Sequence, residues 1–182
     1  HLVAPPSCPI GVGEITREFT TLGEHCDEKD RARFEYVFRQ AAVLLEQNNG
    51  VKRDVGNEGM TLDDFVKQPD ARKAKLTKAH VLALRLYTSN SYGRINWPMR
   101  EGCTEAKPHP YAATTFYIHD AITKLRATRA AGATAVRTFW RGLTDMGVAD
   151  EFMKQGGTEM ACMSTTEDLQ VARKFEKVGE VE

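Results

Sequence analysis

An arginine and two hydroxyl-bearing residues stand at the ends of two short apolar segments in the last third of the chain. Arg141 follows an aromatic pair and precedes Gly142, while Ser164 ends the segment of residues 160–164 and Thr165 follows it. A guanidinium presents a planar, permanently charged fork to phosphate, and hydroxyls donate to and accept from a ribose. Two such strand ends held side by side would bind an anionic ligand that contains a sugar.

Each of these residues also has a plain structural explanation. Arg141 could be a surface arginine held in a salt bridge. Ser164 could simply end a strand, with Thr165 capping the next helix and Asp168 three residues later. These roles can coexist, because a cap formed by Thr165 uses a different hydroxyl from the one on Ser164. We favour the functional interpretation of Arg141, because it lies between aromatic residues and a glycine at a predicted strand end.

Two predicted strands and a helix position these groups. Residues 135–140 alternate enough to form the first strand, and residues 160–164 form the second. Gly156 and Gly157 let the chain turn into this second strand. A helix is predicted over residues 167–177, because its apolar residues recur at helical spacing.

The rest of the chain is predicted to be mainly helical, with apolar residues recurring every three or four positions. The helices are expected over residues 27–47, 61–67, 77–87, 94–99, 111–129 and 149–154. Residues 1–26 begin with several prolines and are expected to form an extended arm. The predicted fold class is α+β, with one domain over residues 27–182. Its helical part, residues 27–130, would pack on a small split β-sheet that is formed within residues 131–182.

These motifs together resemble a known family. The chain carries an aromatic-Arg-Gly strand, a Gly-Gly-x-Glu approach, a Ser-Thr-Thr strand and an x-Asp-x-x-Val-Ala-x-x-Phe helix. They are similar to the ADP-ribosyltransferases of the Arg-Ser-Glu type, and most similar to the arginine-specific mono-ADP-ribosyltransferases. Further similarity upstream lies in Leu86-Tyr87-Thr88, Tyr92, Ile95-Asn96 and Arg100. The resemblance covers residues 76–175, about half of the chain.

The resemblance implies that NAD is the substrate. Arg141, with Gly142, would hold the phosphates or ribose of NAD, and Ser164, with Thr165, would position the nicotinamide ribose. ADP-ribose would pass to a protein acceptor, with arginine as the candidate side chain, and nicotinamide would be released. Hydrolysis of NAD without transfer would use the same residues. The family's third element, a Glu in a Glu-x-Glu or Gln-x-Glu pair on a later strand, is not found, since the Glu-x-Glu letters at residues 180–182 follow Ser164 too closely.

The chemistry explains why the third element matters. Cleavage of the bond between nicotinamide and ribose passes through an oxocarbenium-like transition state, which requires anchored phosphates, a pinned ribose and a carboxylate. Arg141 and Ser164 would supply the first two. Glu159 lies before the second strand and Glu167 opens the following helix, so neither is assigned the third role.

Composition and charge exclude several classes of function. The 182 residues carry 25 basic and 25 acidic side chains, so no overall field draws the chain to nucleic acid or an anionic membrane. No apolar run is long enough to cross a bilayer. The four cysteines lack a Cys-x-x-Cys pair, which argues against a zinc site and leaves one disulfide or free thiols open.

The first residue is His1, which indicates a removed leader or a piece of a longer protein and specifies no compartment.

Two histidines receive structural interpretations. His80 is alone on its predicted helix, without a second ligand at metal-binding spacing. His119 neighbours Asp120 in sequence, but adjacent residues of a helix do not face each other, so no catalytic dyad is predicted.

Two functions of different class remain. In the first, the chain belongs to an NAD-dependent mono-ADP-ribosyltransferase whose catalytic Glu lies beyond the residues given. In the second, it is a catalytically inactive relative with a structural or interaction role in a larger assembly. Two or three short strands cannot form a self-sufficient sheet. The open edge of residues 160–164 would therefore be covered by more of the polypeptide or by a partner chain.

Overall fold

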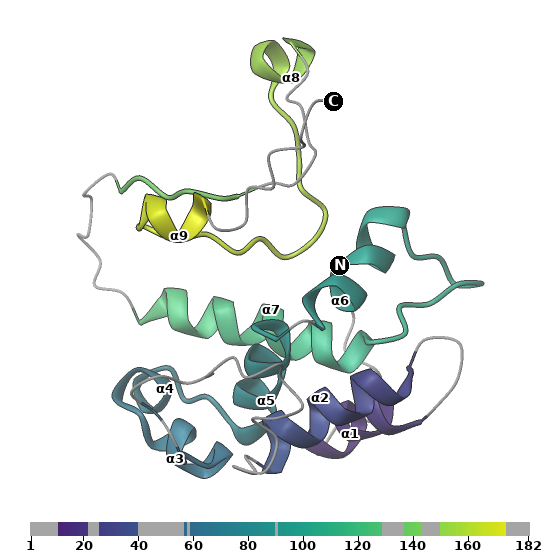
Figure 1. Cartoon of the computed structure of the whole chain (residues 1–182), viewed down its shortest axis with the longest axis vertical. Helices are drawn as coiled ribbons and strands as arrows, with labels where there is room; N and C mark the ends of the chain where they lie inside the picture. The colour runs from purple at the N-terminus through teal and green to yellow at the C-terminus, as the bar shows by residue number, and fades with distance from the viewer. Residues whose placement is uncertain are drawn as a thin grey trace. The chain divides into compact units, whose positions relative to one another are not determined.

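A computed structural model describes residues 11–21, 26–39, 57, 59–89, 91–128, 137–142 and 150–173. The chain divides into two compact units, His1–Ala131 and Gly132–Glu182. In the described residues, helices dominate the first unit, whereas the second has two short helices (Figure 1). The first unit contains α1 (Val12–Thr20), α2 (Glu28–Arg39), α3 (Leu62–Lys67), α4 (Pro69–Lys73), α5 (Lys78–Tyr87), α6 (Tyr92–Glu101) and α7 (Ala112–Ala127). The second contains α8 (Asp150–Gln155) and α9 (Leu169–Arg173). Among the described helices, none combines the length and apolar character that a membrane crossing requires.

The core of the first unit lies where α5 packs along α7, with α1 and α2 against them (Figure 1). Apolar side chains from these helices are fully buried: Ile15, Phe19, Phe34, Val37, Leu82, Leu86, Ile118 and Ala121. The rings of Phe19 and Tyr111 lie 4.8 Å apart between centroids. Burial of each large apolar side chain contributes roughly 1.5–3 kcal/mol. The fold of this unit therefore depends on the helical periodicity that the sequence displays.

Local capping explains where several helices begin. The N–H of Asp64 donates to Thr61 Oγ1 at 3.2 Å and the N–H of Thr61 donates to Asp64 Oδ2 at 2.9 Å, which closes a capping box at α3. Thr77 occupies the same position before α5. The helices predicted over residues 61–67, 77–87 and 111–129 are confirmed to within two residues at each end. Helix α2 confirms the start of the helix predicted over residues 27–47, whose last residues lie outside the described ranges.

Helix α6 is longer than the sequence predicted. Pro98 was expected to limit a short helix over residues 94–99, yet α6 runs from Tyr92 to Glu101 with this proline inside it. It ends at Gly102, whose φ of 87° lies in the left-handed region that favours glycine.

The prediction of an α+β fold with a split β-sheet is wrong for the described residues. In that part of the second unit, one isolated antiparallel bridge joins Trp140, at the end of the first predicted strand, to Thr166, two residues beyond the second, and no ladder extends from it. The segments on either side leave Phe139, Met160 and Met163 47%, 68% and 56% exposed. Strands persist when several of them bury an apolar face together, and these segments bury none. Residues 135 and 136 of the first predicted strand lie outside the described ranges.

The expectation of an extended arm over residues 1–26 also needs correction. Helix α1 occupies Val12–Thr20, and it buries Ile15 and Phe19 completely. These two residues are four positions apart, so they share the face of the helix that packs against α2, α5 and α7. Burial of this apolar face outweighs the glycine within the helix, which costs about 1 kcal/mol relative to alanine.

Candidate functional site

The bridge between Trp140 and Thr166 organises the second unit. The N–H of Trp140 donates to the carbonyl of Thr166 at 2.7 Å, and the N–H of Thr166 donates to the carbonyl of Trp140 at 2.9 Å. Because the two segments run in opposite directions, the residues after Trp140 and the residues before Thr166 leave the bridge at the same end. The four residues that the sequence singled out are among them: Arg141, Gly142, Ser164 and Thr165.

Arg141 is held by a carboxylate from the same unit. Its guanidinium Nη2 lies 3.4 Å from Oε2 of Glu159, and the two side chains are 24% and 28% exposed. The other oxygen of this carboxylate, Oε1, accepts the N–H of Ala161 at 3.0 Å. Glu159 therefore joins Arg141 to the start of the segment that carries Ser164. The sequence placed Glu159 in the Gly-Gly-x-Glu motif before the second strand, and this pairing was not predicted.

The hydroxyls of the second predicted strand have separate positions. Ser164 and Thr165 are exposed. Thr165 does not cap the next helix, contrary to one interpretation of the sequence. Asp168 takes that role, since its Oδ1 accepts the N–H of Gln170 at 2.8 Å, while Oγ1 of Thr166 accepts the N–H of Asp168 at 3.1 Å. The exposed hydroxyls of Ser164 and Thr165 thus lie apart from the start of α9.

A second ion pair lies on the other side of the bridge. Nη2 of Arg137 is 2.5 Å from Oε2 of Glu167, and the two side chains are 52% and 47% exposed. The guanidinium of Arg137 also lies 5.8 Å from the centre of the Phe139 ring. This pair joins the two segments before Trp140 and after Thr166. It provides a natural comparison for the pair between Arg141 and Glu159.

The upstream residues that resemble the ADP-ribosyltransferases belong to the first unit. Asn96 is 3% exposed, and its Nδ2 donates to the hydroxyl oxygen of Tyr87 at 3.3 Å. Tyr92, on the same helix, is 52% exposed. The structure therefore brings two of these residues together across α5 and α6 and places the third on the surface.

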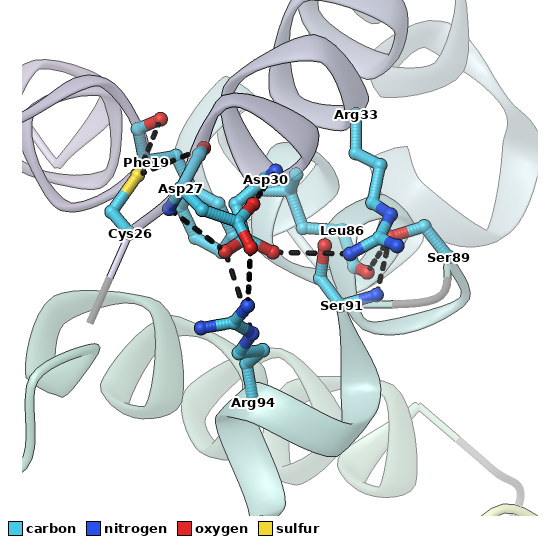
Figure 2. A network of polar contacts seen from close by, with 9 residues as sticks. All are labelled: Phe19, Cys26, Asp27, Asp30, Arg33, Leu86, Ser89, Ser91 and Arg94. Carbon is cyan, nitrogen blue, oxygen red and sulfur yellow. Dashed lines mark hydrogen bonds and ion pairs between the residues drawn. The ribbon is translucent and has the colours of Figure 1, made fainter. Parts of the chain in front are cut away.

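A polar network fixes the start of α6 against the start of α2 (Figure 2). The N–H of Asp30 donates to Asp27 Oδ1 at 2.9 Å and the N–H of Asp27 donates to Asp30 Oδ2 at 3.2 Å, which caps α2. Arg94 of α6 lies 2.5 Å from Asp27 and 3.4 Å from Asp30, and Arg33 lies 3.1 Å from Asp30. The side chain of Asp30 is fully buried, so the two arginines compensate a charge that would otherwise be costly.

His80 joins α5 to α7 in the core of the first unit. Its Nδ1 accepts the N–H of Thr77 at 3.0 Å, which places the ring proton on Nε2, 2.7 Å from Oδ2 of Asp120. Lys124 lies 2.5 Å from the same carboxylate oxygen. Burial lowers the pKa of His80, and Lys124 acts in the same direction. His80 therefore serves as a neutral cap on α5, which is a structural role, as its isolation in the sequence indicated. Asp120 pairs with His80 and not with its neighbour His119.

Glu18 of α1 caps the start of α7. Its carboxylate accepts the N–H of Ala113 at 2.7 Å, and both the N–H and the hydroxyl of Thr114, at 3.0 Å and 2.6 Å. Burial raises the pKa of Glu18 to about 7, against these three hydrogen bonds, which favour the ionised form. This contact was not predicted, because Glu18 falls within the residues expected to form an extended arm. The acidic and apolar pattern of Glu14, Ile15 and Glu18 at helical spacing was the available signal.

Metal chemistry finds no support in the described ranges, where no three potential ligands from His, Cys, Asp and Glu cluster. Among the described residues, Cys26, Cys103 and Cys162 form no disulfide with one another, and Cys8 lies outside the described ranges. Comparisons with models of protein families, with curated proteins and with solved structures gave no match.

Proposed function

We propose that this chain binds NAD and transfers ADP-ribose to a protein acceptor, with release of nicotinamide. One observation supports this most: the bridge between Trp140 and Thr166 holds together the two segments that carry Arg141 on one side and Ser164 and Thr165 on the other. Arg141 would bind the phosphates of NAD, and Ser164 and Thr165 would bind its ribose. A quarter-exposed arginine and exposed hydroxyls on these two segments suit a ligand of this kind, because the side chains are accessible and the charge of the arginine is incompletely screened by water.

The reaction breaks the bond between the nicotinamide nitrogen and C1′ of the ribose, and the acceptor's nucleophile forms its bond to the same carbon. The acceptor loses a proton, and nicotinamide leaves as a neutral molecule. The residues at the bridge bind and orient NAD. Positive charge that develops on the ribose requires a carboxylate. The family resemblance assigns that group to a later strand, whereas Glu159 and Glu167 are each paired with an arginine.

The test is NAD binding, followed by turnover. The purified chain is titrated with NAD by calorimetry, together with Arg141→Ala and the matched control Arg137→Ala from the other ion pair of the unit. Arg141→Ala should abolish binding, whereas Arg137→Ala should retain it. Turnover is measured as transfer of labelled ADP-ribose to an arginine-containing protein, and as nicotinamide release without an acceptor. Equal effects of the two substitutions, or no binding by the wild type at millimolar NAD, would contradict the proposal.

An interaction role without turnover is the second candidate. The apolar residues around the bridge favour it, because Phe139, Trp140, Met160 and Met163 are 42% to 68% exposed. Exposed apolar residues that gather on one region mark surfaces that other protein segments cover. NAD binding without transfer or nicotinamide release, together with a defined complex in sedimentation, would favour this second role over the first.

A further inference from the structure

The carboxylate of Glu159 lies against the guanidinium of Arg141, the group to which the proposed function assigns phosphate binding. The nearest atoms of the two side chains lie 3.4 Å apart, and both side chains are about one-quarter exposed. A fully exposed ion pair is worth little, because water and salt screen it. At this exposure the screening is incomplete, so the carboxylate and an incoming phosphate compete for one guanidinium.

The two oxygens of Glu159 have different partners. Oε1 accepts the N–H of Ala161, and this contact fixes the chain at the start of residues 160–164. Oε2 faces Arg141. Loss of the negative charge would therefore affect Arg141, while an uncharged oxygen could still accept from Ala161. Glutamine has this property, since its amide oxygen is an acceptor of the same reach.

We propose that Glu159 is an internal competitor that limits phosphate binding at Arg141 and makes binding depend on the second anchor at Ser164 and Thr165. This inference rests on the proposed function. A ligand that offers only phosphate must displace the carboxylate without compensation. NAD also offers a ribose to the hydroxyls, so it offsets the loss of the ion pair. Glu159 thereby lowers the affinity of every phosphate ligand by the same factor, so that at a given concentration NAD, with its additional ribose contact, stays bound while free phosphate and pyrophosphate do not.

Calorimetric titration of the full chain with NAD and with inorganic pyrophosphate tests this role. The variants are Glu159→Gln and the matched control Glu167→Gln, which removes the carboxylate of the other ion pair in the same unit. Glu159→Gln should bind both ligands about two- to fivefold more tightly, the range expected for a partly exposed ion pair. Glu167→Gln should bind them as the wild type does. The gain should shrink at about 1 M salt, where the Debye length falls to about 3 Å.

Two outcomes separate failure of this inference from failure of the proposed function. If the wild type binds NAD and Glu159→Gln binds it equally or more weakly, Glu159 does not compete and the inference is overturned. If neither protein binds NAD, the proposed function fails, and pyrophosphate decides the inference. Tighter pyrophosphate binding by Glu159→Gln would then retain the internal competition, and unchanged binding would overturn it. Circular dichroism of both variants verifies that they are folded.

Discussion

Replacing Glu18 by alanine removes the carboxylate that caps α7. Two backbone N–H groups and one hydroxyl lose their acceptor, at distances of 2.6 Å to 3.0 Å. The first N–H groups of a helix have no partner within it, so nothing else in α7 can satisfy them. A helix cap is worth roughly 0.5–2 kcal/mol, and a hydrogen bond to an uncharged group about 0.5–1.5 kcal/mol, the value that suits a carboxyl whose pKa is raised to about 7. Because Glu18 is only partly buried, water replaces some of these bonds, and we expect a loss of about 2–4 kcal/mol in the free energy of unfolding.

The assay is urea unfolding followed by far-UV circular dichroism, with the same dependence on urea required of every variant. Glu14→Ala is the matched control, since Glu14 lies one turn earlier on α1 and its buried Oε2 has no hydrogen-bond partner within the described part of the chain. Its negative charge also raises the pKa of Glu18. Glu14→Ala should therefore leave stability unchanged or increase it. Equal losses in the two variants, or a loss below about 0.5 kcal/mol for Glu18→Ala, would refute this account of the α7 cap.

Three further outcomes are expected in the first unit. Because the pKa of Glu18 is raised to about 7 in the folded chain, the folded chain retains a proton that the unfolded chain releases. The free energy of unfolding should therefore fall as pH rises from about 4.5 to 7. Unfolding titrations across pH should show that Glu18→Gln loses this dependence. The pKa of His80 is lowered, so its contribution to the free energy of unfolding should be present above about pH 6.5 and should fade as pH falls. NMR should find the imidazole ring mainly neutral at pH 6.5. A protonated ring at this pH would contradict the role of His80 as the cap of α5. A Cβ at Gly11 would overlap the ring of Tyr117, so Gly11→Ala should lower the free energy of unfolding by about 1–2 kcal/mol. A Cβ at Gly13 meets no atom within 4 Å, so Gly13→Ala should raise the free energy of unfolding by about 0.5–1 kcal/mol. The reverse order of stability in thermal melts would contradict this packing.

The sequence predicted the helices that carry both periodicity and caps. Thr61 and Thr77 stand immediately before apolar residues at helical spacing, so the starts of α3 and α5 could be located. Helix α1 was missed because nearby prolines and glycines dominated its interpretation. The pair Ile15 and Phe19 was too short a pattern to outweigh them, and only the tertiary surface that buries them reveals the helix.

The contacts between distant residues could not be predicted, because they depend on how elements pack. His80 and Asp120 are forty residues apart and meet only because α5 lies along α7. In the second unit, the sequence located the two segments that meet at Trp140 and Thr166, but it overestimated how far they pair. Alternation of side chains indicates extended backbone, whereas a sheet also requires neighbours that bury one face. The pairing of Arg141 with Glu159 joins residues eighteen positions apart, which no local pattern specified.

The bridge at Trp140 gives the second unit its own optical signal. The chain has two tryptophans, Trp97 on α6 of the first unit and Trp140 in the second. Their side chains are 62% and 42% exposed, so the emission of each responds to its own surroundings. In a Trp97→Phe variant, Trp140 is the sole emitter and stands next to Arg141 in the chain, so fluorescence quenching would follow occupancy of that arginine without a labelled ligand. In Trp140→Phe, the remaining emission would follow unfolding of the first unit alone.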